Sequence, residues 1–315
     1  MENPLISICI PTYKSDFLRD AITSVLSQTY GNIEVIVVND SSPDRNIEPI
    51  VGYFKDKRIH YYKNKENIGG KSLVDSWNKC LEYIHGDFFC FLCDDDLYDK
   101  KHIEKIIKLT EQYPDVNVFK SRTNIIDSKG KIVDFTPASP EFETGYDYLW
   151  HILTVNRRQT LSELFFKTKF FFENGGFINL PLAWGSDQLT CIKLGFITGI
   201  VTSHEASVSF RVSDINLSAW NPINNKKKLI ALLDFHEYVE EILIKQISDR
   251  NIKEIIVKAN QKRKKDVVLQ YLKVLKPADY FKMIKSNRLK EYATISILAY
   301  TFCGMIKSNI RHIFR

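Results

Sequence analysis

The first third of the chain alternates short strand-like runs with segments of helical periodicity, and this alternation restricts the fold more than any other feature of the sequence. Apolar, strand-like runs occupy 5–10, 33–38, 58–62 and 88–93. Apolar residues at helical spacing predict helices at 17–28, 71–84 and 103–113. Because the strands alternate with helices of this length, we expect an α/β fold with a mostly parallel sheet and right-handed crossovers.

The remainder of the chain has a mixed middle part and a helical end. Strands are predicted at 117–126, 131–135 and 161–166, and a short helix closed by Gly195 is predicted at 186–194. From residue 221 onward the pattern predicts helices at 226–246, 252–275 and 278–313. We therefore expect a domain boundary near Trp220, with one domain at 1–220 and a helical C-terminal region at 221–315.

Charge is distributed unevenly between these two parts. Residues 1–220 carry 24 Lys and Arg against 29 Asp and Glu, a net charge of −5, whereas residues 221–315 carry a net charge of +11. A basic helical region favours an anionic surface as partner. No nucleic-acid-binding motif accompanies it, so the face of an anionic membrane is the better interpretation.

The sequence also predicts a cytoplasmic location. Its six cysteines are too few and too scattered for a disulfide framework, which suits a reducing compartment. We expect no signal peptide, because residues 1–4 lead directly into a strand-like run. The longest nearly uncharged apolar run, 293–306, has 14 residues, whereas a spanning helix needs about 20. Any membrane contact would then be peripheral, on the inner face of the cell membrane. The alternative is that the apolar stripe of the tail packs on the catalytic domain or on a second copy of the chain.

Polar loops follow each of the first four predicted strands. In open α/β sheets, ligands bind in the crevice beyond the carboxyl ends of the strands, so these loops are candidates for a nucleotide site. The loop residues are Pro11, Thr12 and Tyr13; Asn39, Asp40, Ser41 and Ser42; Asn67, Ile68, Gly69 and Gly70; and Asp94, Asp95 and Asp96.

The three consecutive aspartates are the strongest single feature. Adjacent carboxylates repel one another unless a cation is present, and oxygen ligands suit a hard ion such as Mn²⁺ or Mg²⁺ completed by phosphate oxygens. The alternative is a solvated acidic loop at the start of a helix, where aspartate is favoured by the helix dipole. Asp95 and Asp96 are the predicted metal ligands, with the ligating member of the trio left open.

Three further positions allow both a structural and a functional interpretation. Asp40 lies in a segment with ordinary turn chemistry, but its carboxylate could also accept from a nucleotide base or ribose. The loop at 67–70 is either a simple connection or an anion site that backbone N–H groups approach. Asp187 begins a predicted helix and is either part of its cap or a general base.

Five blocks of the first 100 residues resemble glycosyltransferase family 2 in order and spacing. Weaker similarity extends to about residue 212 and does not cover the helical tail. The blocks are 7–13 (SICIPTY), 24–30 (SVLSQTY), 36–42 (IVVNDSS), 66–70 (ENIGG) and 86–96 (GDFFCFLCDDD).

The resemblance implies a GT-A fold, which is a Rossmann-like, mixed but mostly parallel sheet with flanking helices, here with a C-terminal helical extension. It implies a nucleotide-sugar donor, commonly UDP-linked, a divalent cation and inversion at the anomeric carbon. The position of each residue implies its role: Pro11, Thr12 and Tyr13 border the uracil, Asp40 binds the base, Asp94 the ribose, Asp95 the metal, Arg211 the pyrophosphate side, and Asp187 is the catalytic base. Asn67 and Gly70 are predicted to border the donor.

The chain departs from the family pattern at three positions. Cys93 stands where many members have the first aspartate of an Asp-x-Asp motif. Lys71 follows the double glycine where a small residue is usual, and we expect it to reach a donor phosphate. The base lies in Ser186-Asp187-Gln188 where many members have Glu-Asp.

These observations predict a glycosyltransferase that acts on a saccharide acceptor, lipid-linked at the membrane surface. Two other classes stay open. A sugar nucleotidyltransferase also has a nucleotide-binding sheet, but it carries a glycine-rich basic loop after its first strand, where this chain has Pro11–Lys14. A non-catalytic nucleotide-binding or scaffold protein on the same fold is the other class.

Overall fold

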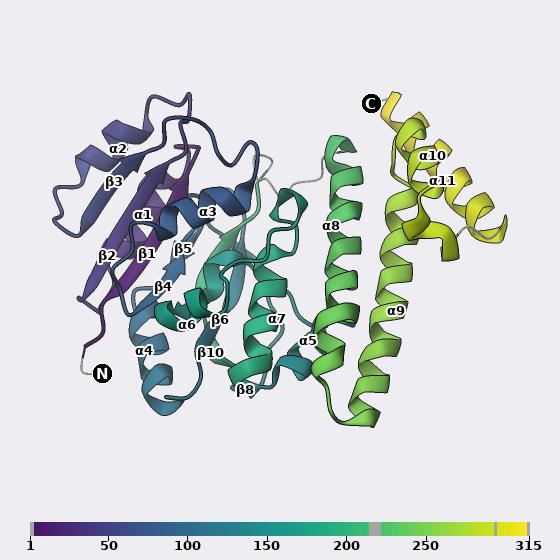
Figure 1. Cartoon of the computed structure of the whole chain (residues 1–315). Helices are drawn as coiled ribbons and strands as arrows, with labels where there is room; N and C mark the ends of the chain where they lie inside the picture. The colour runs from purple at the N-terminus through teal and green to yellow at the C-terminus, as the bar shows by residue number, and fades with distance from the viewer. Residues whose placement is uncertain (1–2, 214–221, 293–294, 314–315) are drawn as a thin grey trace. The chain divides into compact units, whose positions relative to one another are not determined.

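The computed structural model describes residues 3–213, 222–292 and 295–313, and the chain divides into two compact units (Figure 1). The first unit contains Met1–Asn179 and Ser186–Asn216, and the second contains Leu180–Gly185 and Leu217–Arg315. The segment Leu180–Gly185 thus belongs to the second unit, although the sequence analysis assigned it to the first domain. The predicted boundary at Trp220 lies outside the described residues.

The first unit is built on a single mixed sheet, which confirms the predicted α/β class. Among the described residues the strand order is β3-β2-β1-β4-β9-β6-β10-β5, with β7 paired to β6 and β8 to β10. The strands are β1 (Ile6–Thr12), β2 (Ile33–Asn39), β3 (Ile59–Lys63), β4 (Phe88–Phe91), β5 (Leu97–Tyr98), β6 (Val118–Ile126), β7 (Ile132–Phe135), β8 (Phe142–Glu143), β9 (Leu164–Lys167) and β10 (Ile200–Arg211). The helices are α1 (Leu18–Leu26), α2 (Ile47–Tyr53), α3 (Leu73–Leu81), α4 (His102–Gln112), α5 (Gly145–Leu153), α6 (Thr168–Glu173) and α7 (Ser186–Thr198).

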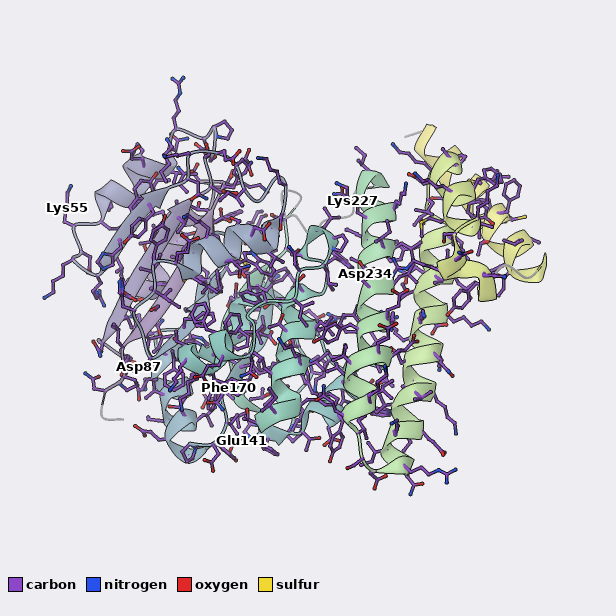
Figure 2. The ribbon with its side chains drawn as sticks, in the orientation of Figure 1. Lys55, Asp87, Glu141, Phe170, Lys227 and Asp234 are labelled. Atoms are coloured by element: carbon purple, nitrogen blue, oxygen red, sulfur yellow. The ribbon has the colours of Figure 1, made fainter. Side chains whose placement is uncertain are left out.

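Helices cover both faces of this sheet, and side chains fill the space between the ribbons (Figures 1 and 2). Successive side chains of a strand point to opposite faces, so alternate residues of β1 such as Ile8 pack in one core with α1, α2 and α4. On the other face, Trp77 of α3 lies 6.4 Å from Phe91, and Phe171 of α6 lies 4.8 Å from Phe89, between ring centroids. Burial on both faces explains why the central strands are continuous apolar runs.

The parallel strands β3, β2, β1 and β4 end at the same edge of the sheet. Backbone hydrogen bonds between neighbouring strands continue to these ends. The Asp40 N–H donates to the Thr12 carbonyl at 3.0 Å, and the Asn64 N–H donates to the Asn39 carbonyl at 2.8 Å. The loops that follow these strands therefore lie side by side, as the sequence predicted.

The second unit is helical. Its described helices are α8 (Asn225–Tyr238), α9 (Arg250–Leu272), α10 (Pro277–Ile284) and α11 (Ile295–Ile313), with a π-helical turn at Val239–Leu243 and 3₁₀ turns at Pro222–Asn224, Ile244–Gln246 and Asn287–Tyr292. They share a core in which Leu233 of α8, Leu272 of α9 and Met305 of α11 are buried. Asp234 of α8, labelled in Figure 2, accepts a 2.7 Å hydrogen bond from Arg288. No helix in the described part of the chain combines the length and apolarity that crossing a membrane requires.

Two predicted helix limits were wrong. Gly195 does not close α7, which continues to Thr198 and ends before Gly199, whose φ is +79°. Gly195 is needed inside the helix, because a Cβ there would lie 2.7 Å from the side chain of Ile200. The single helix predicted at 278–313 is divided into α10 and α11, since the Ser286 hydroxyl bonds back to the Met283 carbonyl at 2.7 Å and ends the first helix.

Several elements were missed by the sequence analysis, and the longest of these is β10. Its pairing with β6 shifts register between Ser203 and Ala206, so His204 and Glu205 are exposed in succession. Two consecutive exposed residues interrupt the alternation from which a strand is recognised. Helices α2, α5 and α6 and the two-residue strands β5 and β8 were also missed.

Candidate functional site

Asp94 holds the loop that follows β1. Its Oδ2 accepts hydrogen bonds from the Thr12 hydroxyl at 3.1 Å and from the backbone N–H groups of Tyr13 at 2.9 Å and Lys14 at 3.1 Å. Burial raises the pKa of Asp94, while the hydrogen bonds from Tyr13 and Lys14 lower it. Thr12 and Asp94, both predicted to contact the nucleotide, thus come together, and the Tyr13 side chain is exposed beside them.

Asp40 organises the glycine loop that follows β3. Its Oδ1 accepts from the Asn64 side chain at 2.7 Å and the Ile68 backbone N–H at 2.9 Å, and its Oδ2 accepts from the Gly69 N–H at 2.6 Å. A Cβ on Gly69 would lie 2.8 Å from that same Oδ2, which explains the glycine. In this structure Asp40 therefore shapes the loop, and its contact with the base stays a prediction.

The remaining predicted loop residues extend this arrangement. The Asn67 Oδ1 accepts from the backbone N–H of Gly70 at 2.5 Å, which folds the loop ahead of α3. Lys71 pairs with Glu66 at 2.6 Å, and both side chains are mostly exposed. Pro11, near the carboxyl end of β1, is half-buried.

Asp96 is engaged inside the protein rather than open to a ligand. Its side chain is fully buried; Oδ2 accepts from the Ser162 hydroxyl at 2.5 Å, and Oδ1 accepts from the Arg211 backbone N–H at 2.9 Å. Burial, followed by the charge of Asp95, raises the pKa of Asp96. This placement differs from the predicted metal ligation by Asp96.

Arg211 is likewise a structural element of this loop. Its Nε donates to the Asp95 carbonyl at 2.9 Å, and its Nη1 donates to the carbonyls of Asp127 and Ser128, both at 3.2 Å. Only 3% of Arg211 is exposed, and its bonds to backbone carbonyls fix the loop that presents Asp95. Its role on the pyrophosphate side stays a prediction.

Asp95 is the aspartate whose side chain suits a metal. The Asp95 side chain is half-buried, and its backbone carbonyl is held by the Arg211 guanidinium. Burial, followed by the charge of Asp94, raises the pKa of Asp95 to about 6. A divalent cation would relieve this crowding of negative charge.

The residues fit a metal ion whose ligands come partly from the protein and partly from a bound diphosphate. In the part of the chain that the structure describes, no three His, Cys, Asp or Glu side chains are arranged as a metal site. Mg²⁺ commonly binds through one or two carboxylates and completes its shell with substrate phosphates and water. Asp95 could supply one such carboxylate, so the metal site would be complete only with the donor.

Asp187 lies in the first turn of α7. Burial raises the pKa of Asp187 to about 6, while hydrogen bonds from the Gln159 side chain and the Gln188 backbone N–H lower it. The Gln159 Nε2 donates to its Oδ2 at 3.3 Å. A carboxylate with a pKa near 6 is ionised at neutral pH yet basic enough to accept a proton.

The segment 159–163 connects these two groups of residues, and the sequence analysis missed it. Gln159 contacts Asp187, and Ser162 contacts Asp96 as well as the Cys93 N–H, to which its Oγ lies 3.1 Å. The same short segment therefore positions both the predicted base and the acidic loop. A Ser and a Gln carry no charge pattern, so only their place before the strand β9 could have indicated them.

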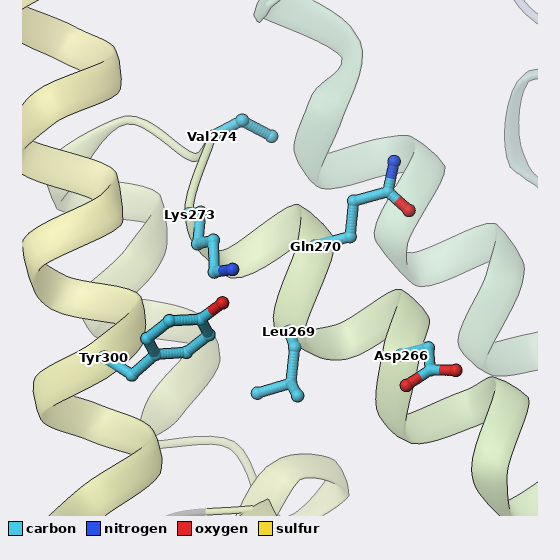
Figure 3. Close-up of a pocket in the computed structure, with 6 residues that line it drawn as sticks. All are labelled: Asp266, Leu269, Gln270, Lys273, Val274 and Tyr300. Atoms are coloured by element: carbon cyan, nitrogen blue, oxygen red, sulfur yellow. The ribbon is translucent and has the colours of Figure 1, made fainter.

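The second unit contains a separate open pocket (Figure 3). It lies between α9 and α11, where the Lys273 ammonium group lies 3.8 Å from the centre of the Tyr300 ring. None of its residues is among those predicted for catalysis or donor binding. They are Asp266, Leu269, Gln270, Lys273, Val274 and Tyr300.

Comparisons with known structures agree with this fold. The chain superposes on the Staphylococcus aureus TarS 1–349 structure in complex with UDP-GlcNAc with a TM-score of 0.68, covering 97% of this chain and 91% of that one at 14% identity. It also superposes on the mannosyltransferase PcManGT from Pyrobaculum calidifontis in complex with GDP-Man and Mn²⁺, with a TM-score of 0.58, 97% and 87% coverage and 14% identity. The sheet and its flanking helices are those of the GT-A fold.

Sequence comparisons identify the family. An uncharacterized glycosyltransferase of Rickettsia typhi is 30% identical over 220 residues, which are 67% of this chain and 65% of that protein. Another, from Methanocaldococcus jannaschii, is 29% identical over 177 residues, or 54% of this chain and 60% of its own length. The matches thus span less than two thirds of these relatives. The model for glycosyl transferase family 2 matches residues 7–173, more than half of the chain, and the chain therefore belongs to glycosyl transferase family 2.

Proposed function

We propose that this protein transfers a hexosyl or N-acetylhexosaminyl group from a UDP-sugar to an acceptor hydroxyl with inversion at the anomeric carbon. The observation that carries the proposal is Asp187, a carboxylate with a pKa of about 6 that one short segment connects to the acidic loop. The TarS structure that shares the fold contains UDP-GlcNAc, which supports a nucleotide-sugar donor.

In the proposed reaction Asp187 acts as the general base. Its carboxylate accepts the proton of the acceptor hydroxyl while the hydroxyl oxygen forms a bond to the anomeric carbon. The bond from that carbon to the diphosphate breaks on the opposite face, and the diphosphate leaves with the electron pair. Holding both substrates in this geometry contributes much of the rate.

Asp95 and the loop residues would bind the donor. The nucleotide would be enclosed by residues from adjacent strand ends, namely Thr12, Tyr13, Asp40, Asp94 and the loop at 67–70. Asp95 would hold Mn²⁺ or Mg²⁺, which when bound offsets the charge that develops on the diphosphate. Arg211 would hold the backbone of Asp95 in place.

Release of nucleoside diphosphate from a panel of UDP-sugars, with Mn²⁺ and saccharide acceptors, tests the proposal. We expect release by the native chain and a decrease of at least about 100-fold for Asp95→Asn and for Asp187→Asn. Asp20→Asn, an exposed aspartate in the first turn of α1, is the matched control and should retain full activity. UDP binding without release in the native chain would favour the scaffold class, and nucleotidyl transfer from a nucleoside triphosphate would favour the nucleotidyltransferase.

We further propose that the acceptor is lipid-linked and that the basic C-terminal helices dock on the inner membrane face. Apolar side chains outside the core support this: Phe281 of α10 is 50% exposed, and Phe302 and Ile306 of α11 are 38% and 41% exposed. Basic helices with exposed apolar residues bind anionic lipid surfaces.

Sedimentation with phosphatidylglycerol vesicles tests this docking. We expect the native chain to sediment and Phe281→Ser/Phe302→Ser/Ile306→Ser to stay in the supernatant. Ile132→Ser/Val133→Ser, which removes exposed apolar residues of β7, is the control and should sediment like the native chain. Equal sedimentation of the native chain and the triple variant would reject membrane docking through these residues.

A further inference from the structure

A buried ion pair lies behind Asp187, in the first unit. The Lys120 Nζ on β6 lies 2.9 Å from the Glu163 Oε1, and their side chains are 4% and 1% exposed. The Glu163 Oε2 accepts a 2.7 Å hydrogen bond from the Thr123 hydroxyl. Burying two charges is costly, so a pair held this precisely needs a reason beyond stability.

Hydrogen bonds lead from this pair to Asp187. The Lys120 ammonium group donates to the Tyr148 Oη at 3.2 Å, the Tyr148 hydroxyl donates to the Gln159 Oε1 at 2.7 Å, and the Gln159 Nε2 donates to the Asp187 Oδ2 at 3.3 Å. Tyr148, on α5, is fully buried.

The charge of Lys120 fixes the direction of every bond in this chain. An ammonium group can only donate, so the Tyr148 oxygen accepts from it and the single hydroxyl proton is available for Gln159. The Gln159 side-chain amide must then present its oxygen to Tyr148 and its N–H to Asp187. An amide N–H favours the ionised carboxylate, whereas a reversed amide would present its oxygen and favour the protonated one.

We propose that Tyr148 and Gln159 are positioning residues that hold Asp187 ionised and oriented through a hydrogen-bond chain anchored on Lys120. This inference rests on the proposed function, because it concerns the base of that reaction. Gln159 fixes the Oδ2 oxygen of the carboxylate, and in the proposed reaction the other oxygen, Oδ1, would receive the acceptor proton.

Other ionisable groups share the surroundings of Asp187 and are unchanged in the variants used below. Burial is the largest cause of the raised pKa of Asp187, and the charge of Glu163 raises this pKa further. Cys191 lies one turn further along α7, and burial raises the pKa of its thiol. The groups near the hydrogen-bond chain are Lys120 on β6, Glu143 on β8 with its partner Arg157 at 2.8 Å, Glu163 in the 3₁₀ turn Leu161–Glu163, and Cys191 on α7.

The pH profile of kcat/KM for Tyr148→Phe tests the proposal. Without the tyrosine hydroxyl the Gln159 amide is free to reverse, so we expect the midpoint of the profile to rise by about one pH unit. Activity at pH 6 should then fall about fivefold and at pH 8 less than about twofold, with the donor KM unchanged. Tyr113→Phe, which removes a hydroxyl bonded to Glu141, is the control and should keep the native midpoint.

Gln159→Glu provides a second variant. Gln159 is half-buried, so we expect its substitution to disturb folding less than a substitution at the fully buried Tyr148. It places a carboxyl beside Asp187, so the midpoint should rise by at least as much as in Tyr148→Phe. Unchanged midpoints in both variants, with activity retained, would overturn the proposal.

Carboxyl ¹³C NMR separates this inference from the proposed function. The Asp187 resonance, assigned by its absence in Asp187→Asn, should titrate at higher pH in Tyr148→Phe than in the native chain. If the native chain released no nucleotide but this shift occurred, the chain of bonds would stand and the transferase proposal would fail. An unshifted Asp187 titration would reject the chain of bonds whatever the activity.

Discussion

The Ser162 hydroxyl lies 2.5 Å from the Asp96 carboxylate and is one of the contacts through which the segment 159–163 holds the acidic loop. Asp96 is fully buried, so an unsatisfied oxygen there would be costly. The three neighbouring aspartates consequently have different surroundings: Asp96 is buried and bonded, Asp94 bonds the β1 loop, and Asp95 is half-buried.

Removing this hydroxyl should destabilise the fold. We expect Ser162→Ala to lower the free energy of unfolding by about 1–3 kcal/mol, because a buried carboxylate and the Cys93 N–H each lose a partner. Urea denaturation measures the change, and Ser27→Ala, which removes an exposed hydroxyl of the α1 C-terminus, serves as the control. Equal unfolding midpoints for the two variants would contradict the role given to Ser162.

Asp187 should reduce the stability of the native chain at neutral pH. Its folded pKa of about 6 exceeds the usual value of 3.8, so the stability it contributes is present below pH 3.8 and is lost as the pH rises through 6. We expect Asp187→Asn to be more stable than the native chain by about 1–3 kcal/mol at pH 8 and equal to it near pH 3. Urea denaturation at both pH values, with Asp20→Asn for comparison, measures this difference.

Metal binding should depend on the nucleotide. Because Asp95 is the one aspartate of its loop suited to ligate, we expect Mn²⁺ to bind weakly alone and at least about tenfold more tightly with UDP, whose phosphates complete the shell. Electron paramagnetic resonance of free Mn²⁺ measures both affinities. Asp95→Asn should lose the enhancement; tight Mn²⁺ binding by that variant would assign the metal to another residue.

A side chain at position 69 should weaken the donor site. In Gly69→Ala the new Cβ would meet the Asp40 Oδ2, so the loop must move away from that carboxylate. We expect UDP affinity to fall about tenfold, as for the loss of about 1.4 kcal/mol of binding free energy. Calorimetric titration measures it, with Gly31→Ala as control because no atom lies within 4 Å of a Cβ there.

The close crossing of α5 and α7 should tolerate no side chain. A Cβ on Gly145 would overlap the backbone of Phe196 on α7. We expect Gly145→Ala to destabilise the chain by about 3 kcal/mol or more, as overpacking against a backbone does. Gly52→Ala, whose Cβ would meet nothing within 4 Å, should instead be neutral or stabilising in thermal unfolding.

The sequence predicted those parts of the fold that local periodicity encodes. The buried strands β1, β2 and β4 are continuous apolar runs, and the loops that follow them carry recognisable polar residues. The bulged strand β10 was missed because its exposed residues come in succession. The roles of Asp95 and Asp187 came from the resemblance to glycosyltransferase family 2, because spacing alone left the role of Asp187 open, and both roles stay predictions.

The sequence could not predict which hydrogen-bond partners, distant along the chain, give similar residues different roles. Asp94, Asp95 and Asp96 are chemically identical in the sequence. Partners that are distant along the chain, such as Thr12, Ser162 and Arg211, distinguish them. Gln159 has no signature of its own, because its role follows from Tyr148 and the buried Lys120 behind it.

The short stretch Leu180–Gly185 belongs to the helical unit although the chain returns to the sheet unit at Ser186. Trp184 lies beneath the Lys228 ammonium group of α8, at 4.0 Å from the ring centre, only three residues before Asp187. The helices therefore cannot be exchanged as a simple C-terminal cassette. A chimera that takes its C-terminal helices from a relative must also take the relative's residues that correspond to Leu180–Gly185. Otherwise the segment that leads to Asp187 loses its contact with α8.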